Sequence, residues 1–149
     1  MTTRNQIEQF LAQNLIAVAG VSRNPKKFGF TAFKEVMNKG LNVIPINPHA
    51  ESIDGIACYP SVDALPDSVK SLWILTPKSQ SFAVAEAAIK KGIPNVWIQQ
   101  MSETPEVLNL FKERDVNLIS KECLLMFYKP HSIHKFHRAI KKFFGRLPK

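Results

Sequence analysis

Short apolar runs alternate along the chain with segments in which apolar side chains recur at helical spacing. The apolar runs predict strands at residues 16–19, 42–46, 56–58, 71–75, 95–98 and 116–119. The expected helices are residues 6–13, 30–39 and 79–91, and a further one capped by Thr104 with Pro105 at its first position. This alternation is typical of βαβ units around a parallel sheet.

The fold class predicted from this order is α/β, with a single Rossmann-like, doubly wound parallel sheet and helices on both faces. Right-handed crossovers give the strand order 3-2-1-4-5-6, with the switch point between strands 1 and 4. The carboxyl ends of the strands then meet at one crevice. The loops at that edge begin at Gly20, Asn47, Thr76, Gln99 and Ser120. Their convergence from distant parts of the sequence predicts a nucleotide-like ligand there.

The segment after the first strand has the features of a phosphate-binding turn. Gly20 ends the apolar run, and the loop that follows carries Arg23, Lys26 and Lys27 before Gly29. The helix expected at residues 30–39 begins directly afterwards, and a helix N-terminus offers free N–H groups and the positive end of its dipole. A phosphate suits this corner. An ordinary βα turn without a ligand is the alternative.

Two common nucleotide motifs are missing from the sequence. A dinucleotide fingerprint needs G-x-G-x-x-G spacing and an acid at the end of the second strand, whereas Gly20 stands alone until Gly29 and the second strand ends at Asn47. A Walker A segment is also missing. The longer basic loop favours a ligand with more phosphate charge than a dinucleotide carries.

Composition adds a division of charge along the chain. The 149 residues correspond to one domain, with a formal net charge of +8. Residues 1–128 carry 13 Lys and Arg against 12 Asp and Glu, whereas residues 129–149 carry seven basic residues and no acidic one. We therefore expect a domain over residues 1–128 and a basic amphipathic helix within residues 129–149 that packs on it or extends it.

Several motifs of the sequence resemble those of a known family, the small stand-alone CoA-binding proteins. These are similar to the CoA-binding domain of succinyl-CoA synthetase and of acyl-CoA synthetases. The resemblance covers residues 12–127. It is carried by Ala19-Gly20-Val21-Ser22-Arg23-Asn24-Pro25, Pro45-Ile46-Asn47-Pro48, Gly55, Tyr59-Pro60-Ser61, Leu65-Pro66, Trp97-Ile98-Gln99 and Cys123. It implies coenzyme A as a non-covalent ligand. The family usually has a glycine shortly after the glutamine, whereas this chain has Met101.

The resemblance also implies which residues contact the ligand. The pyrophosphate would be held by Gly20, Val21, Ser22, Arg23 and Lys26. The adenosine end would be bordered by Asn47 and Pro48, and the crevice beneath would be lined by Thr76 and Pro77, with Gln99 in a neighbouring wall.

Candidate catalytic groups are few. Ser22 is expected to bind phosphate by a hydrogen bond rather than to act as a nucleophile, because no base accompanies it in the sequence. Cys123 follows the last expected strand and is expected to be a buried thiol, although a mixed disulfide with a pantetheine thiol is the alternative. Cys58 is expected to be structural. No catalytic residue and no metal site are assigned.

The C-terminal segment offers three interpretations. The favoured one is docking of its apolar stripe on the core, because exposed aromatic side chains promote aggregation. A membrane surface or a protein partner comes second, and nucleic acid comes third because no base-reading module accompanies the basic residues. His131, His134 and His137 are spaced by three residues but diverge around a helix, so we expect them to pack rather than to bind metal.

The function expected from the sequence is non-catalytic binding of CoA or acyl-CoA, as a carrier, sensor or accessory module. One alternative is an NAD(P)- or CoA-linked redox enzyme that uses Cys123, and another is an interaction protein that uses the basic C-terminal helix. No apolar run is long enough to span a bilayer and the N-terminus does not resemble a secretory signal, so a cytoplasmic location is expected. A protein partner or a homodimer is left open.

Overall fold

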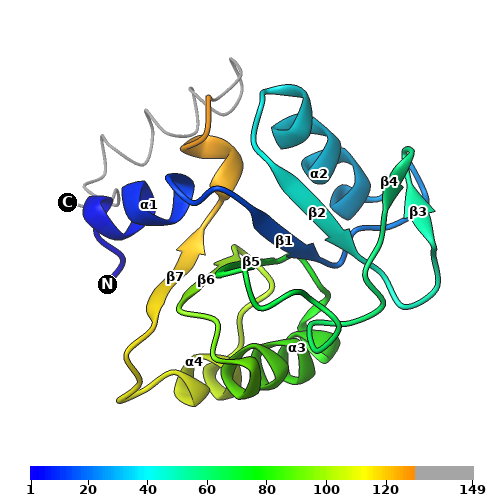
Figure 1. Ribbon diagram of the computed structural model, residues 1–149. Coiled ribbons are helices and arrows are strands. Elements are labelled where there is room, and N and C mark those ends of the chain that lie inside the picture. The colour runs from blue at the N-terminus through cyan, green and yellow to red at the C-terminus, as the bar shows by residue number, and fades with distance from the viewer. Residues whose placement is uncertain (130–149) are drawn as a thin grey trace.

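A parallel five-stranded sheet in the order β2-β1-β5-β6-β7 forms the centre of the computed structural model, which describes residues 1–129 (Figure 1). Its strands are β1 (Ile16–Ala19), β2 (Val43–Ile46), β5 (Ser71–Ile74), β6 (Asn95–Gln99) and β7 (Asn117–Glu122). The helices are α1 (Arg4–Leu11), α2 (Phe28–Asn38), α3 (Lys78–Lys91), α4 (Pro105–Leu110) and the short 3-10 helix η1 (Leu124–Met126). The predicted α/β, Rossmann-like class is confirmed.

The third predicted strand does not join this sheet. Residues 52–57 instead form a separate antiparallel hairpin of β3 (Ser52–Ile53) and β4 (Ile56–Ala57). Its two-residue turn is Asp54-Gly55, and both residues have a positive φ, as a tight hairpin turn requires. After β4 the chain pairs with β2 through an isolated parallel bridge between Tyr59 and Ile46. The other five predicted strands lie in the expected order. Beside β2, where the strand predicted at residues 56–58 was expected, the structure has the bridge at Tyr59.

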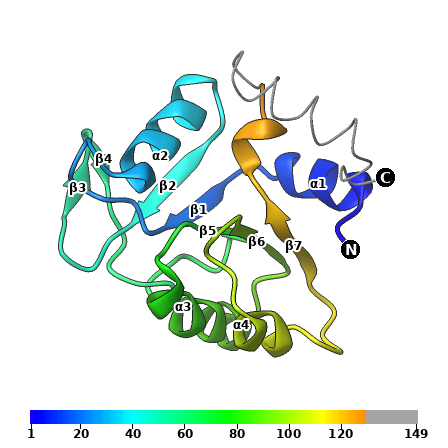
Figure 2. The same cartoon turned by 180° about the vertical axis from the view of Figure 1, so that it is seen from behind.

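Helices cover both faces of the sheet, with α1 and α2 on one side and α3 and α4 on the other (Figures 1 and 2). Side chains along β1 alternate between the two layers: Ile16 and Val18 pack on the α1 and α2 side, whereas Ala17 and Ala19 pack on the other. All four are buried, because a parallel sheet covered on both faces needs apolar residues on both.

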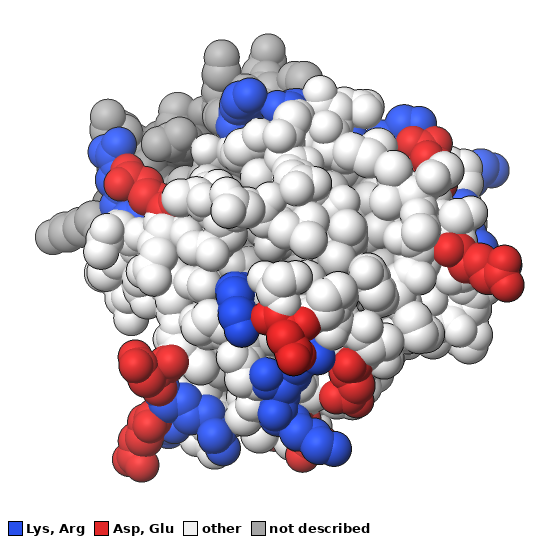
Figure 3. All heavy atoms as spheres, in the orientation of Figure 1, with Lys and Arg blue, Asp and Glu red and all other residues white. Residues whose placement is uncertain are grey.

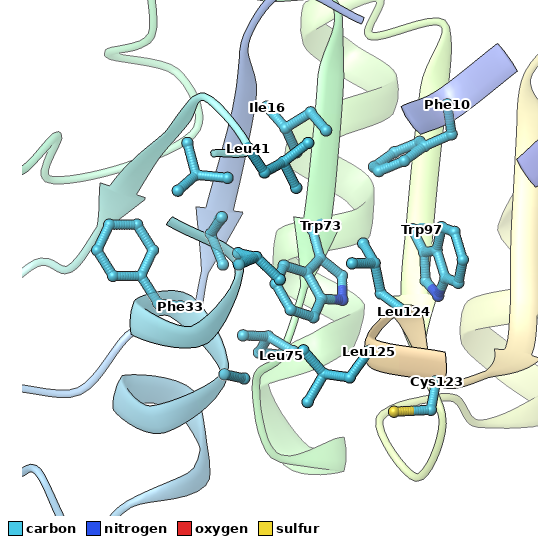
Figure 4. Close-up of a cluster of buried hydrophobic side chains, with 14 of the residues drawn as sticks. Phe10, Ile16, Phe33, Leu41, Trp73, Leu75, Trp97, Cys123, Leu124 and Leu125 are labelled. Atoms are coloured by element: carbon cyan, nitrogen blue, oxygen red, sulfur yellow. The ribbon is translucent and has the colours of Figure 1, made fainter. Parts of the chain in front are cut away.

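Two tryptophans form the centre of the α1 and α2 layer (Figure 4). Trp73 on β5 and Trp97 on β6 are partners in the sheet register, and both side chains are fully buried. The indole N–H of Trp97 donates to the carbonyl of Glu122 at 3.0 Å, and Phe10 packs edge-on against its ring with centroids 5.4 Å apart. Burial of these large rings is therefore combined with satisfied N–H groups.

Side chains from the N-terminal residues cover the outer edge of β7. The Thr2 hydroxyl lies 3.2 Å from the carbonyl oxygen and 3.3 Å from the amide nitrogen of Ser120, and Gln6 Nε2 donates to the carbonyl of Leu118. These groups occupy the positions to which a further strand would bond.

Charged side chains of both signs are interspersed over the described surface, as the near balance of residues 1–128 predicts (Figure 3). On the face shown they lie mainly at the margin and in the lower part. No helix within residues 1–129 is long and apolar enough to cross a membrane. The expected C-terminal helix and its three histidines lie outside the described residues.

Candidate functional site

A cleft of about 650 Å³ opens at the carboxyl edge of the sheet, where the sequence predicts a ligand site. The loops after β1, β2 and β5 and the first turns of α2 and α3 contribute to its walls. Its volume lies in the range of small-molecule sites. The cleft lies beside β1 and β5, which are the strands at the predicted switch point.

Two glycines bring the chain together at the base of this cleft. A Cβ on Gly20 would lie 2.7 Å from the backbone of Leu75 and Thr76, and a Cβ on Gly29 would lie 2.0 Å from the carbonyl oxygen of Gly20. Both positions are therefore closed by the protein's own backbone rather than by a ligand. Gly29 lets the start of α2 pack directly on the end of β1, which is the packing role of the third glycine in a dinucleotide fingerprint.

The loop between these glycines is held by its own side chains. Ser22 Oγ accepts from the amide of Asn24 at 3.0 Å, and Asn24 Oδ1 accepts from the amide of Lys26 at 2.9 Å. The hydroxyl proton of Ser22 stays available for a ligand oxygen. Lys27 is the N-cap residue of α2, and no side chain within residues 1–129 caps that helix. The amide of Phe30 donates to the carbonyl of Lys27 at 3.1 Å, whereas those of Phe28 and Gly29 have no hydrogen-bond partner within residues 1–129 and are available at the cleft.

The N-terminus of α3 also faces the cleft, through Pro77 and Gln80. Its N-cap residue is Pro77, and none of the described side chains caps this helix. Beneath it the hydroxyls of Thr76 and Ser81 are 2.9 Å apart and buried. Ser81 Oγ also lies 3.1 Å from the carbonyl of Pro77, so this pair fixes the turn from β5 into α3.

Asn47 ties the loop after β2 to the loop after β1. Its Nδ2 donates to the carbonyl of Val21 at 2.8 Å, and its Oδ1 accepts from the amide of His49 at 2.7 Å. Both ends of the amide are therefore used within the protein. Asn47 lines the cleft and also sets the position of its neighbours.

The far part of the cleft runs along α3. Small apolar side chains at helical spacing, Ala83, Val84 and Ala87, form one wall. Residues 60–63, including Asp63, also line the cleft. Lys91 holds this segment beside α3, because its Nζ donates to the carbonyl of Asp63 and forms an ion pair with Asp67 at 3.4 Å.

Most of the residues predicted to contact the ligand lie together in the cleft. Those that line it are Gly20, Val21, Ser22, Asn47, Pro48, Thr76 and Pro77. Arg23 and Lys26 are exposed on the same loop and do not line it, whereas Lys27 does.

Gln99 lies elsewhere. It is buried, and its Oε1 accepts from the indole N–H of Trp73 at 3.1 Å and from the amide of Leu124 at 3.2 Å. In the structure it connects the core to η1 and does not line the cleft.

Several cleft residues are not among the ligand contacts assigned from the sequence: Lys27, Phe28, His49, Asp63, Gln80, Ala83, Val84 and Ala87. The spacing of Gln80, Ala83, Val84 and Ala87 places them on one helix face, a signal present in the sequence. Nothing in the sequence reveals that this face borders the ligand site, because helix rotation relative to the cleft is set by tertiary packing.

Two features near the carboxyl edge lie outside the cleft lining. Met101, where the family resemblance leads us to expect a glycine, has φ +78° and is 72% exposed. The turn after β6 thus keeps a backbone conformation that favours glycine. Cys123 is 9% exposed and packs in the core.

Burial raises the pKa of the Cys58 thiol. No cluster of metal-ligating side chains is found in residues 1–129.

Known proteins match this chain over most of its described length. It is 32% identical over 129 residues to the alpha subunit of ADP-forming acetate–CoA ligase II from Pyrococcus furiosus, which covers 79% of this chain but only 28% of the relative. It is 24% identical over 123 residues to the uncharacterized protein YneT of Bacillus subtilis, covering 82% and 91% of the two chains.

Solved structures share the fold. A conserved hypothetical protein from Pyrococcus furiosus superposes with a TM-score of 0.72 and 31% identity, over 76% of this chain and 97% of that one. The family model described as CoA binding domain matches residues 14–129, which include every element that lines the cleft. The chain therefore belongs to the CoA binding domain family.

Proposed function

We propose that this protein binds coenzyme A or acyl-CoA non-covalently in the cleft between α2 and α3, without acting on it chemically. The observation that carries the proposal is the convergence of two helix N-termini, neither of them capped by a described side chain, on the cleft of a CoA binding domain. Free N–H groups and positive dipole ends favour an anionic diphosphate.

The diphosphate would lie over residues 20–29. Backbone amides, the Ser22 hydroxyl and the Lys27 ammonium group supply donors and positive charge on this side. The apolar wall of Ala83, Val84 and Ala87 suits a flat or extended apolar part of the ligand. CoA combines both kinds of group, whereas inorganic phosphate would leave the apolar wall unused.

Support for a non-catalytic role comes from what lines the cleft. Acyl transfer or hydrolysis needs a nucleophile with a base in reach. Ser22 Oγ bonds to the amide of Asn24 and has no histidine or carboxylate as a hydrogen-bond partner within residues 1–129. Cys123, the residue that the redox alternative requires, is a core side chain. We infer a carrier, sensor or accessory module.

Calorimetric titration and thermal unfolding with CoA, acetyl-CoA, NAD, NADP and ATP test the proposal. A ligand at about 100 times its Kd should stabilise the fold by about 2.7 kcal/mol. For a chain of this size that raises Tm by roughly 5–11 °C. We expect this shift with CoA and acetyl-CoA. A shift with NAD alone would favour the redox alternative instead.

A matched pair of variants locates the diphosphate. Lys27→Gln removes a lysine that lines the cleft, and Lys26→Gln removes an exposed neighbour that does not. We expect Lys27→Gln to weaken CoA binding by about tenfold, since hydrogen bonds to charged groups contribute about 1.5–3 kcal/mol. Lys26→Gln should have a much smaller effect. Equal losses in the two variants would show that the charge of the loop acts only at long range.

A further inference from the structure

His49 is the histidine that lines the cleft among the described residues. It follows β2, and in a Rossmann-like sheet the residues after the second strand contact the ribose of the nucleotide. Its backbone is fixed, because its amide donates to Asn47 Oδ1 at 2.7 Å and Asn47 in turn bonds to Val21. Its imidazole is exposed and makes no hydrogen bond within residues 1–129. The loop after β2 therefore carries, in the cleft lining, an imidazole with no hydrogen-bond partner among the described residues.

The charges around this position suit an additional anion. A carboxylate at the end of β2 would accept ribose hydroxyls and repel a ribose phosphate, but this chain has the neutral Asn47 there. Within residues 1–129 the charged side chains that line the cleft with His49 are Lys27 and Asp63. Asp63 lies on the segment whose backbone Lys91 holds beside α3, whereas His49 lies on the loop after β2.

We propose that His49 recognises a phosphate group on the ribose, so that the cleft prefers a 3′-phosphorylated ADP moiety to its unphosphorylated counterpart. This inference rests on the proposed binding of CoA and specifies which part of the ligand decides affinity. The imidazolium donates a charge-assisted hydrogen bond to a phosphate oxygen. Lys27 strengthens the positive field from the α2 side.

Such recognition depends on pH. Histidine is the side chain that ordinarily gains or loses its charge between about pH 5 and pH 8. A bound phosphate favours the protonated imidazole, so the preference is largest at mildly acidic pH and declines as the proton is lost. The other charged groups near His49 are Lys27 and Asp63 in the cleft lining and Glu51, two positions later on the same loop.

The test compares CoA with dephospho-CoA, which lacks only the 3′-phosphate, by calorimetric titration at about pH 6 and about pH 8. We expect the native chain to bind CoA about tenfold more tightly than dephospho-CoA at the lower pH and only about two- to threefold more tightly at the higher. The ligand phosphate also titrates, with a second pKa of about 6. Variants separate the two contributions.

His49→Gln should remove most of the preference at both pH values, because it should weaken the binding of CoA much more than the binding of dephospho-CoA. His49→Lys should keep the preference and make it nearly independent of pH, apart from the titration of the phosphate. Lys90→Gln, which removes an exposed positive charge from the last turn of α3, should leave the ratio of affinities as in the native chain.

The outcomes distinguish this inference from the function on which it rests. If neither CoA nor dephospho-CoA binds, the proposed function itself is wrong. If both bind and His49→Gln leaves their ratio and its pH dependence as in the native chain, the cleft binds CoA but His49 does not read the phosphate. A ratio that falls equally in His49→Gln and Lys90→Gln would also overturn the inference.

Discussion

The four α-helices of residues 1–129 differ in how their N-termini are capped. In α1 and α4, which lie away from the cleft, threonine side chains satisfy the first-turn amides: Thr3 accepts from Gln6, and Thr104 accepts from Val107 at 3.2 Å. In α2 and α3 the N-cap residues are Lys27 and Pro77, and no described side chain takes this role. The two uncapped ends are the ones that line the cleft.

Under the proposed function, the two uncapped helix ends exchange stability for ligand binding. An N-cap side chain contributes about 1 kcal/mol to a helix. Its oxygen would also occupy the N–H groups that an anion needs. Glu106 in the first turn of α4 is in effect a built-in anion, whereas the first turns of α2 and α3 contain no acidic residue. A ligand phosphate at the cleft would accept from first-turn amides and place negative charge at the helix N-terminus, as Thr104 and Glu106 do in α4.

The largest effect is expected from Gly29→Ala, because the added side chain should push the N-terminus of α2 away from the end of β1. The added Cβ would lie 2.0 Å from the carbonyl oxygen of Gly20. Overpacking of this kind costs about 1–3 kcal/mol, and the displaced amides should weaken CoA binding by about tenfold or more. Chemical denaturation and calorimetric titration measure the two losses.

Gly92→Ala is the control for this substitution. Gly92 has φ +74° and no atom within 4 Å of an added Cβ, so the change introduces backbone strain without a clash. It should cost about 1–2 kcal/mol of stability and leave CoA affinity unchanged. A native affinity in Gly29→Ala would show that the exact position of the α2 N-terminus does not matter for binding.

The next effect comes from giving α2 the cap that it lacks. Lys27 has an extended N-cap backbone, with φ −84° and ψ 144°, so an aspartate there can accept from the first-turn amides. Lys27→Asp should raise or preserve the stability of the free protein while weakening CoA binding by more than Lys27→Gln does. Opposite signs in unfolding and binding measurements are the signature of competition for the same N–H groups. Loss of both would mean that the substitution disrupts the loop.

A smaller effect is expected when a cap is removed away from the cleft. Thr104→Ala leaves the amide of Val107 without its acceptor and should lower the free energy of unfolding by about 1 kcal/mol. CoA affinity should not change, because α4 does not line the cleft. A substantial change in affinity would contradict the separation of the two classes of helix end.

The smallest effect concerns the charge of Glu106. Its own backbone amide and the Thr104 hydroxyl lower the pKa of this carboxyl from its ordinary value of 4.5. The resulting stabilisation is fully present above that value and is lost as the pH falls through the lower pKa of the folded state. Thr104→Ala should move the pKa of Glu106 upward, as NMR titration can measure. An unchanged pKa would show that the threonine hydroxyl does not act on the carboxylate.

Sequence pattern was sufficient to predict the main sheet because its inner strands β1, β5 and β6 are buried on both faces. Continuous apolar runs such as 71–75 are distinctive. The Thr104-Pro105 start of α4 was also predicted, since both residues have strong positional preferences. The error at residues 56–58 came from overlooking Asp54-Gly55, a strong local signal for a tight hairpin.

The cleft was only partly predictable, for a physical reason. The loops that follow parallel strands must meet at one edge, so Ser22, Asn47 and Thr76 could be grouped without coordinates. Which side chain of a basic loop faces inward depends on local turns. In this loop, where Ser22 and Asn24 accept from backbone amides, Lys27 lines the cleft and Lys26 does not. Gln99 follows the same edge, yet its acceptor is used by a buried indole.

The groups along the two outer strands have a consequence for assembly. Thr2 and Gln6 bond to the free side of β7, and at β2 the amide of Asn47 and the carbonyl of Pro45 bond to Tyr59. A neighbouring molecule could lengthen the sheet only by displacing these bonds first. Both borders are thus protected against edge-to-edge aggregation, so the protein can leave its ligand-facing rim open without also offering a template for strand addition.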